Sequence, residues 1–573
     1  MTHNERPSFT MVLHSHIPYV LNHGRWPHGT DWLNEATAGS YIPLLNVLNR
    51  LVDEGISPKL TLGITPVLAE QFADAGFRTE FSSYLRNKIE VAEENAREFE
   101  HSGMEEMNAL AESWQTHFTE LQHAFEDRYG GDLVGAFKAL QDEGHIEILT
   151  SAATHGYFPL LSEDVSIDAQ IKCGVSAYQR HFGRAPRGLW PPELAYRPEY
   201  EWTPPVSHPK RKGSYPRKGV ERLLSENRIE YFLIDTPLLK GGKSIGVYLA
   251  RFKALQQLWE QFEAQYQPRE QIEKSPYRPY LVGGGAEITP VAIFTRDSEI
   301  GLQVWSGEWG YPGDAWYLDF HKKHFPGGHR YWRVISSKAD LADKEIYNPQ
   351  MARERVVENA SHFVHLAAEI LNQRGPQDEP GILVAPFDTE LFGHWWFEGV
   401  EFLYLVLKQL GEREEVTLVT CGEYLDRYPP NEIVALPEGS WGEGGFHWIW
   451  LNEWTEWTWE RIYDAEVEMI DLAGEYAGIP DGTLQEILKQ AGRELLLLQA
   501  SDWQFLISTW SARDYAEMRF SRHYEDFERL ARMARTYQET GNLDAGDRGF
   551  LEECMDRDRV FSDVNPAWWA PDE

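Results

Sequence analysis

Short apolar runs alternate along this sequence with longer segments of helical periodicity. The apolar runs lie at residues 9–14, 59–65, 145–151, 187–190, 230–236, 291–295, 381–387 and 416–420. Buried strands that alternate with helices form a parallel sheet, and seven or eight such units favour a sheet that curls into a barrel. The alternation therefore predicts an α/β fold built on a barrel.

Two regions interrupt the alternation and carry helical signals alone. Within residues 79–140, apolar side chains recur every three or four positions, which indicates one buried helix face: Met107, Leu110, Trp114, Phe118, Leu121 and Phe125. After about residue 455, a second helical register follows the start signal PDGT at 480–483, with Leu484, Ile487, Leu488, Ala491, Leu495 and Leu498. We predict a barrel domain over residues 1–430 with a helical insertion at 79–140, and a helical domain over 431–573.

Two long connections contain many residues that break regular structure. Residues 201–218 are rich in proline and basic side chains and are predicted to form a loop. Residues 237–290 contain proline and glycine on either side of a charged helical stretch. Long loops in compact domains tend to serve as lids or binding loops, so we take 237–290 as the candidate lid.

The charge balance disfavours some classes of partner. The chain has 54 basic and 90 acidic side chains, for a net charge of −36. Such a surface repels nucleic acid and anionic lipid headgroups, although its simplest role is solubility. Three cysteines without metal-type spacing, and the lack of an apolar run of signal-peptide or membrane-span length, favour a cytoplasmic location. The oligomeric state is not predicted.

Polar side chains follow four of the apolar runs directly. They occur in LHSHIPY at 13–19, TSAATHGYFPLL at 150–161, GLWPPELAYRP at 188–198 and APFDTELFGHWWFEG at 385–399. In a barrel of parallel strands, catalytic groups lie at the carboxyl ends of the strands and in the loops that follow. We therefore expect these four segments to meet in one site.

Two of these segments carry a carboxylate in a constrained setting. Glu193 follows two prolines, which hold the backbone extended, and Asp388 precedes Phe392, His394, Trp395 and Trp396. We take His394 and Trp395 as candidate substrate-binding residues. Cleavage of a glycosidic bond needs two carboxyl groups, one of them protonated, and apolar surroundings raise the pKa of that group. Asp388 then suits the acid role and Glu193 the nucleophile, although either carboxylate alone fits a salt bridge or helix cap equally well.

His14 and His16 lie on one side of the first strand, because alternate residues of a strand share a face. Together with Asp388 they could form part of a zinc site, as in a metal-dependent deacetylase. Neither an HExxH motif nor a clustered aspartate supports that interpretation. We favour hydrogen bonding to sugar hydroxyls and expect no metal or other cofactor.

The chain contains 22 tryptophans, several of them clustered beside glycine. Trp26 and Trp32 lie in NHGRWPHGTDWLNE, Trp305 lies in QVWSGEWGYPGDAWY, and Trp441 and Trp450 lie in GSWGEGGFHWIWLNEWTEWTW. Clusters of this kind do not follow a helical period, and sugar rings stack on indole faces. We interpret them as exposed platforms for a long polymer, although some will be core.

Four segments together resemble glycoside hydrolase family 57. HSHIPY, THGYFPLL, WPPELAYRP and FDTELFGHWW match the conserved regions of that family in order, and the resemblance covers essentially the whole chain. Within the family, HGRWPHG, GYPGD, RYWRV and the tryptophan-rich stretch from 440 to 459 resemble 1,4-α-glucan branching enzymes and not amylases or 4-α-glucanotransferases.

The resemblance implies a (β/α)7 incomplete barrel with a helical insertion and a C-terminal helical domain. It also implies a retaining double displacement without metal, with Glu193 as nucleophile and Asp388 as general acid/base. His14 and His155 correspond to histidines beside the reacting sugar, with Arg296 near them. Trp32, Trp305, Trp441 and Trp450 correspond to glucan-binding tryptophans, the last two supplied by the helical domain.

The implied activity is cleavage of α-1,4 linkages in amylose or glycogen and transfer of the chain to a glucan 6-hydroxyl. Retention requires the two carboxyl groups to lie about 5 to 5.5 Å apart. A lid must exclude water from the intermediate, and residues 237–290, with Tyr248, are the candidate. The alternatives are an α-amylase-like hydrolase or 4-α-glucanotransferase at the same site and, less well supported, a metal-dependent polysaccharide deacetylase or a glucan-binding scaffold.

Overall fold

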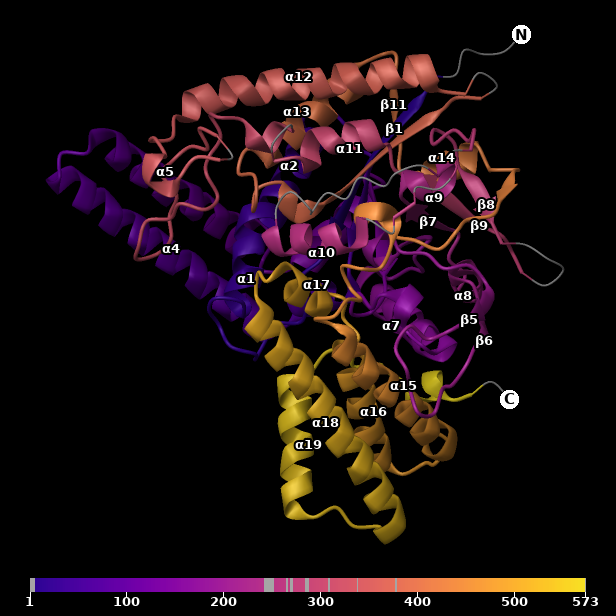
Figure 1. The fold of residues 1–573 in the computed structure, drawn as a ribbon. Helices are drawn as coiled ribbons and strands as arrows, with labels where there is room; N and C mark the ends of the chain where they lie inside the picture. The colour runs from indigo at the N-terminus through magenta and orange to yellow at the C-terminus, as the bar shows by residue number, and fades with distance from the viewer. Residues whose placement is uncertain are drawn as a thin grey trace.

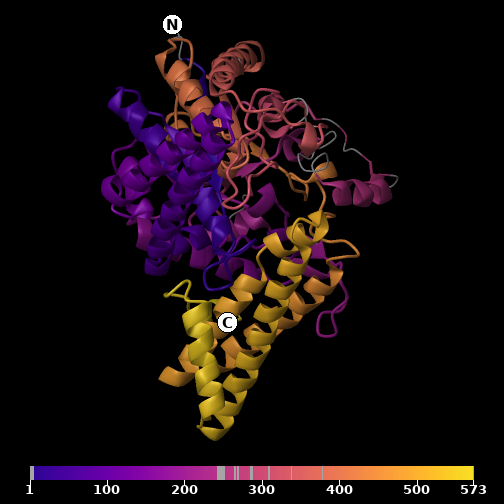
Figure 2. The same cartoon turned by 90° about the vertical axis from the view of Figure 1, so that its left-hand side faces the viewer.

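The computed structural model describes residues 6–241, 252–263, 266–267, 270, 272–283, 288–307, 310–336, 338–376 and 379–571. A curled sheet lies at its centre, helices surround the sheet, and a bundle of helices extends from one side (Figures 1 and 2). Tyr248 lies outside the described residues.

Seven parallel strands form the core of the sheet, in the spatial order β10-β1-β2-β3-β4-β7-β9. Their bounds are β1 (Ser8–Ser15), β2 (Leu60–Ile64), β3 (Ile146–Ser151), β4 (Gly188–Trp190), β7 (Tyr231–Ile234), β9 (Val291–Thr295) and β10 (Ile382–Asp388). Each coincides with a predicted apolar run. The eighth run forms the short strand β11 (Thr417–Leu418), which pairs with β1.

The two ends of this seven-strand path approach each other. Arg296, just beyond β9, forms an isolated parallel bridge with Val384 of β10, and the Asp297 N–H donates to the Val384 carbonyl at 3.2 Å. Two short strands, β8 (Tyr280–Val282) and β12 (Ile433–Val434), extend the sheet beyond β9. The prediction of an incomplete barrel with seven parallel strands is confirmed.

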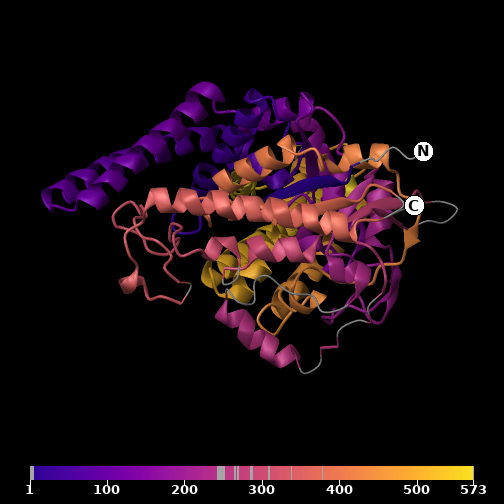
Figure 3. The ribbon, with the colours of Figure 1, turned by 90° about the horizontal axis from the view of Figure 1, so that it is seen from above.

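Helices cover the outside of the barrel, so that β1 is buried along its whole length. Apart from three helices described below, the α-helices of the described residues before the C-terminal bundle are α1 (Thr30–Ala36), α2 (Ile42–Asp53), α3 (Pro66–Ala73), α6 (Leu133–Asp142), α7 (Asp164–Phe182), α8 (Val220–Glu226), α9 (Thr236–Lys240), α11 (Ser298–Trp305), α12 (Pro349–Arg374), α13 (Gly399–Glu412) and α14 (Cys421–Arg427). Seen from above in Figure 3, α12 lies across this outer layer.

The helical insertion is a hairpin of two long helices, α4 (Ala75–His101) and α5 (Glu105–His123), which projects from the barrel (Figures 1 and 3). The six apolar side chains that predicted it are all buried. The loop that contains residues 327–331 packs on this hairpin, because Lys88 Nζ donates to the Gly327 carbonyl at 2.6 Å and Trp114 Nε1 donates to the Arg330 carbonyl at 2.7 Å.

The stretch 201–218 contains regular structure, so the prediction of a simple loop was wrong. Strands β5 (Tyr200–Trp202) and β6 (Tyr215–Arg217) form an antiparallel pair. The pair is anchored because Trp202 and Arg217 are buried, and Arg217 Nε donates to Asp164 at 2.7 Å. Basic side chains of this stretch are thus held by acidic partners, Arg217 by Asp164 and Arg211 by Glu163.

The described part of 237–290 contains α9, helix α10 (Lys253–Glu263) and β8. Phe252, just before α10, lies against Phe505, with ring centroids 6.0 Å apart. Trp259, within α10, lies against Trp448, with ring centroids 5.8 Å apart. The segment therefore bridges the barrel and the C-terminal helices.

The C-terminal helices are α15 (Glu456–Tyr476), α16 (Gly482–Leu498), α17 (Asp502–Thr509), α18 (Arg513–Thr540) and α19 (Ala545–Arg557). Asp481 caps α16 by accepting from the Leu484 N–H, as the PDGT signal predicted. The division at residue 430 stays a prediction. No helix within the described residues combines the length and apolar character needed to cross a bilayer.

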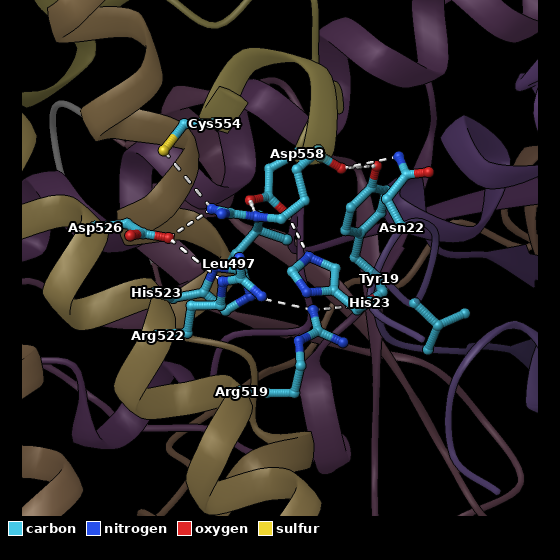
Figure 4. Close-up of polar contacts among 12 residues, drawn as sticks. Tyr19, Asn22, His23, Leu497, Arg519, Arg522, His523, Asp526, Cys554 and Asp558 are labelled. Carbon is cyan, nitrogen blue, oxygen red and sulfur yellow. Dashed lines mark hydrogen bonds and ion pairs between the residues drawn. The ribbon is translucent and has the colours of Figure 1, made fainter. Parts of the chain in front are cut away.

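A buried polar network joins the segment after β1 to these helices (Figure 4). His23 Nε2 lies 2.5 Å from Asp558 Oδ1, and Arg519 donates to the Tyr19 carbonyl at 2.7 Å. Arg557 in turn donates to Asp558 Oδ2 at 2.7 Å. The network fixes the orientation of the helical bundle relative to the barrel, since each of these groups is buried.

Candidate active site

The segments after β1, β3 and β4 meet at the carboxyl ends of the strands. His14 Nε2 lies 3.1 Å from His155 Nε2, and the His14 ring stacks on Trp190 with centroids 4.5 Å apart and planes 7° from parallel. Asp388, at the end of β10, is the register partner of His14. The expectation that these segments share one site is thus met at the level of geometry.

Glu193 lies in a left-handed backbone conformation, with φ of 60°, directly after Pro191 and Pro192. This conformation is unfavourable for residues other than glycine and is enriched at functional sites. Trp441 Nε1 donates to Glu193 Oε2 at 2.7 Å, and Ser501 Oγ lies 3.4 Å from Oε1. The carboxylate therefore has a fixed position.

Burial distinguishes the two carboxylates. Glu193 is only 8% exposed, whereas Asp388 is half-buried, so the inference that Asp388 is the more desolvated group was wrong. Burial raises the pKa of Glu193 to about 7, although the hydrogen bond from Trp441 opposes this rise. A carboxylate with such a pKa is partly ionised at neutral pH.

Three histidine rings form a stack beside Glu193. The His16 and His155 centroids lie 4.2 Å apart, and the His14 and His155 centroids 5.1 Å apart. Burial lowers the pKa of both His14 and His155. Burial also opposes protonation of His16, but Asp502, at 2.9 Å from Nε2, raises the pKa of His16 overall. Within the stack, His14 and His155 therefore favour the neutral form, whereas His16 favours the protonated form.

Trp441 lies among other aromatic rings and a guanidinium. Its ring makes edge-on contacts with Trp190 and Trp305, both with centroids 5.5 Å away, and the Arg296 guanidinium carbon lies 5.8 Å from its centroid. Arg296 forms two hydrogen bonds of 2.9 Å with the Asp235 carboxylate. These contacts orient the indole N–H toward Glu193, and they place Arg296 and Trp305 near the site.

Other predicted residues lie elsewhere. Trp26 is 76% exposed in the loop before α1, and Trp32 is half-buried on α1. Trp450 is 0% exposed and stacks on Tyr157 with centroids 4.4 Å apart. Trp305 and Trp441 are also buried, so the prediction that these three tryptophans form exposed platforms was wrong. Glycine-rich sequence does not require exposure, because here the ring packs into the junction of the two domains.

His394 and Trp395 contact a different aromatic group. Their ring centroids lie 5.6 and 4.5 Å from that of Phe320. His394 and Phe320 line a cavity at the base of the α4–α5 hairpin, and Trp395 lies beside Phe320. Direct contact of either residue with a glucan stays a prediction.

The sequence interpretation missed Ser501 and Asp502. Ser501 Oγ lies 2.9 Å from His155 Nδ1, and Asp502 pairs with His16, 486 residues earlier in the chain. Both residues stand at the start of α17, so the C-terminal helices complete the site. No local motif marks them, and only the folded arrangement brings them to Glu193.

Glu390 was also missed, although it lies two residues after Asp388. Its Oε1 accepts from the His16 backbone N–H at 3.0 Å and from the Tyr41 hydroxyl. Burial raises the pKa of Glu390 to about 7. The sequence Thr389-Glu390-Leu391 after the strand could have suggested a buried acid at Glu390, but it gives no sign of the partners His16 and Tyr41.

His16, His155 and Asp502 could in principle hold a metal ion, since their ligand atoms lie within 4.8 Å of one another. Both ring nitrogens of His16 already have partners, Thr65 Oγ1 at 3.1 Å and Asp502. Those of His155 face His14 and Ser501. Metal binding would break these hydrogen bonds, so the donor set fits a hydrogen-bonded site better; the absence of a cofactor stays a prediction.

Comparison with known proteins now defines the family. The family model described as glycosyl hydrolase family 57 matches residues 10–437. The chain belongs to glycosyl hydrolase family 57. A second model, described as the C-terminal region of 1,4-alpha-glucan branching enzymes, matches residues 461–569, which include Ser501 and Asp502.

Individual members of family 57 resemble the chain over nearly its full length. It is 42% identical to a 1,4-alpha-glucan branching enzyme of Thermococcus kodakarensis, over 97% of this chain and 77% of that protein. The solved branching enzyme of Pyrococcus horikoshii superposes with a TM-score of 0.86 at 40% identity, covering 99% of this chain and 97% of the other. The α-amylase AmyC of Thermotoga maritima, also solved, gives 0.80 at 28% identity, covering 99% and 100%.

Proposed function

We propose that this family 57 member is a 1,4-α-glucan branching enzyme. It would cleave an α-1,4 linkage and transfer the released chain to a glucan 6-hydroxyl. The observation that carries the proposal is the composition of the site: residues 461–569 match the C-terminal region of branching enzymes, and this region supplies Ser501 and Asp502. Identity with a branching enzyme over 97% of the chain supports the same conclusion.

In the proposed first step, a Glu193 carboxylate oxygen attacks the anomeric carbon while the bond to the leaving oxygen breaks. Asp388 donates its proton to that oxygen, so the leaving glucan departs with a free 4-hydroxyl. In the second step, Asp388 removes the proton of an acceptor 6-hydroxyl, whose oxygen displaces Glu193. Two inversions retain the α configuration.

The surroundings of Glu193 support the nucleophile role. The Trp441 N–H and the charge of His16 both favour the ionised carboxylate, against the effect of burial. The neutral rings of His14 and His155 can donate to or accept from sugar hydroxyls, because an uncharged imidazole has one donor and one acceptor nitrogen. His16, paired with Asp502, can supply a positive charge that stabilises the ionised Glu193 carboxylate.

Transfer in preference to hydrolysis requires that water be kept from the glycosyl intermediate. The low exposure of Glu193 supports this, as does the packing of α10 against the C-terminal helices. We propose that residues 237–290, of which α10 is part, form the lid; the role of Tyr248 stays a prediction.

An α-amylase-like hydrolase is the second candidate, because the Thermotoga maritima α-amylase shares the fold over 99% of this chain. The two candidates differ in the acceptor of the second step and not in the first. A 4-α-glucanotransferase would differ in the same way, since a 4-hydroxyl would then attack the intermediate.

The deciding experiment is incubation of the purified protein with amylose, followed by proton NMR of α-1,6 linkages and by reducing-end assay. A branching enzyme produces α-1,6 signal faster than new reducing ends. Reducing ends without α-1,6 signal would identify a hydrolase. Redistributed chain lengths with neither product would identify a 4-α-glucanotransferase.

A further inference from the structure

A cavity lies at the base of the α4–α5 hairpin and is lined by residues of both helices, of the loop 320–330 and of the segment 394–397. It has a volume of about 70 Å³, enough for a small ionic group and too little for a glucan chain. His394 and Phe320 line it, so it contains part of the FGHWW segment, which makes none of the Glu193 contacts described above.

The cavity concentrates positive charge in a strongly acidic protein. Lys88, Lys323 and Arg330 line it, and among the described residues that line it only Glu35 is acidic. Glu35 lies 3.8 Å from Lys323. The lining therefore has an excess of two positive charges, although the whole chain has a net charge of −36.

Several buried donors at this cavity lack partners. Within the described part of the chain, Arg330 Nη1 meets no hydrogen-bond acceptor, and Glu398, Glu35 and Asp319 act on Arg330 through charge. Both ring nitrogens of His329, which is 3% exposed, lack a partner in hydrogen-bond geometry among the described residues, although the Lys88 backbone is close enough to oppose part of the fall in the pKa of His329. Buried polar groups in folded proteins are nearly always paired, so these groups point to a missing ligand.

Aromatic rings complete the lining. The Arg330 guanidinium lies 5.9 Å from the Phe320 centroid and 5.8 Å from that of Phe397. Phe320 also contacts Trp395, which is 44% exposed, with ring centroids 4.5 Å apart and planes tilted by 31°. An exposed indole beside a cationic cavity suits a ligand with a charged end and a sugar ring.

The charges in the cavity also oppose one another. Burial lowers the pKa of Lys88 to about 8 and the pKa of both His117 and His394 to about 4. Glu35 opposes the shifts of Lys88 and His394, whereas the charge of Arg330 lowers all three pKa values further. An anion in the cavity would relieve this repulsion, because an opposite charge favours the protonated form of each group.

We propose that this cavity binds a phosphate group, carried by a hexose phosphate or present as free phosphate. A phosphate monoester has close to two negative charges at neutral pH, which matches the excess of positive charge in the lining. Its oxygens would accept from Arg330, Lys323 and His329, and a hexose would lie over Trp395. This site is separate from Glu193 and does not depend on the proposed branching activity.

Isothermal titration calorimetry tests the proposal with glucose 6-phosphate, inorganic phosphate and glucose, in a chloride buffer of low ionic strength. We expect both phosphate probes to bind and both to weaken as salt is added. Tighter binding of glucose 6-phosphate would assign the site to a hexose phosphate, and equal affinities would assign it to free phosphate. The absence of binding by either probe, or equal binding of glucose and its phosphate, would overturn the proposal.

Matched variants locate the site. Lys323→Ala removes a lining cation and should weaken phosphate binding about tenfold or more. Lys322→Ala is the control, because Lys322 lies 4.5 Å from the Trp332 ring centroid and not in the cavity lining. Arg330→Gln provides a second test if Lys323→Ala does not fold. Equal affinity in the wild type and in both folded lining variants would overturn the assignment.

Discussion

At the scale of single residues, three features of its surroundings hold Glu193 in place. Its left-handed backbone, its burial and the Trp441 hydrogen bond all restrict one carboxylate to one position. The position of Asp388 is fixed by the strand register, because Asp388 ends β10 opposite His14 of β1. The two carboxylates therefore differ in environment, as two-carboxylate glycosidase chemistry requires.

Removing either carboxylate should abolish chemistry while leaving glucan binding in place. We expect Glu193→Gln and Asp388→Asn each to lower kcat by at least about 10³-fold, because each removes one partner of the double displacement. Amylose binding, measured by affinity electrophoresis, should stay within about twofold of the wild type, since the binding surface is unchanged. Substantial residual activity in either variant would reject that residue as catalytic.

The pKa of Glu193 predicts a pH dependence. Because the nucleophile must be ionised and burial raises its pKa to about 7, kcat/KM should fall as the pH drops through 7. Trp441→Phe removes a hydrogen bond that lowers this pKa, so the acidic limb of the profile should move to higher pH. Trp448→Phe is the control, since Trp448 Nε1 donates to the Glu443 carbonyl. An unchanged limb in Trp441→Phe would contradict the assigned role of Glu193.

Some residues of the site could be predicted from the sequence and others could not. His14, His155 and Glu193 could be grouped because polar residues at the ends of parallel strands converge. Trp450 could not be assigned correctly, since glycine neighbours say nothing of whether an indole packs inside. Ser501 could not be found at all, because 308 residues separate it from Glu193.

At the scale of elements, the strands that coincide with an apolar run were predicted, including the short strands β4 and β11, whereas four other short strands were not. All eight apolar runs form strands, and the α5 face and the α16 cap follow the sequence pattern. Strands β5, β6, β8 and β12 have two or three residues each, too few for a periodicity to show. Their pairing depends on tertiary contacts such as those of Arg217.

Helix α17 is the element that links the two parts of the site. Asp502→Asn should remove the charge that raises the pKa of His16, and burial should then leave His16 neutral. We expect kcat to fall about ten- to hundredfold, because the histidine stack loses its cation and its anchor. NMR titration should show the His16 pKa falling in Asp502→Asn and staying constant in Asp514→Asn, an exposed residue of α18. A kcat equal to that of the wild type would show that α17 is not needed for the chemistry.

At the scale of the whole molecule, function requires the barrel and the helical bundle in one fixed arrangement. The buried network of Figure 4 provides this fixation, since His23 of the barrel region contacts Asp558 beyond α19. The sequence showed two regions but not how they meet, because the network joins residues that are 500 and 535 positions apart.

Asp558→Asn should therefore weaken the junction. Removing one partner of a buried ion pair leaves Arg557 and His23 incompletely satisfied, and we expect the free energy of unfolding to fall by about 3 kcal/mol. Arg513→Ala, which breaks an exposed pair with Glu517, should cost at most about 1 kcal/mol. Chemical denaturation measures both. Equal effects would show that the network contributes no more than a surface pair.

The central claim is that Glu193 forms the glycosyl intermediate in a site that both domains complete. Incubation with 5-fluoro-α-glucosyl fluoride, followed by proteolysis and mass spectrometry, tests it most directly, because a slow second step traps the intermediate. We expect a glucosyl ester on the peptide that contains Glu193, and no labelled peptide from the Glu193→Gln variant. A label on Asp388 or on another residue, or an active enzyme that forms no ester at all, would contradict it.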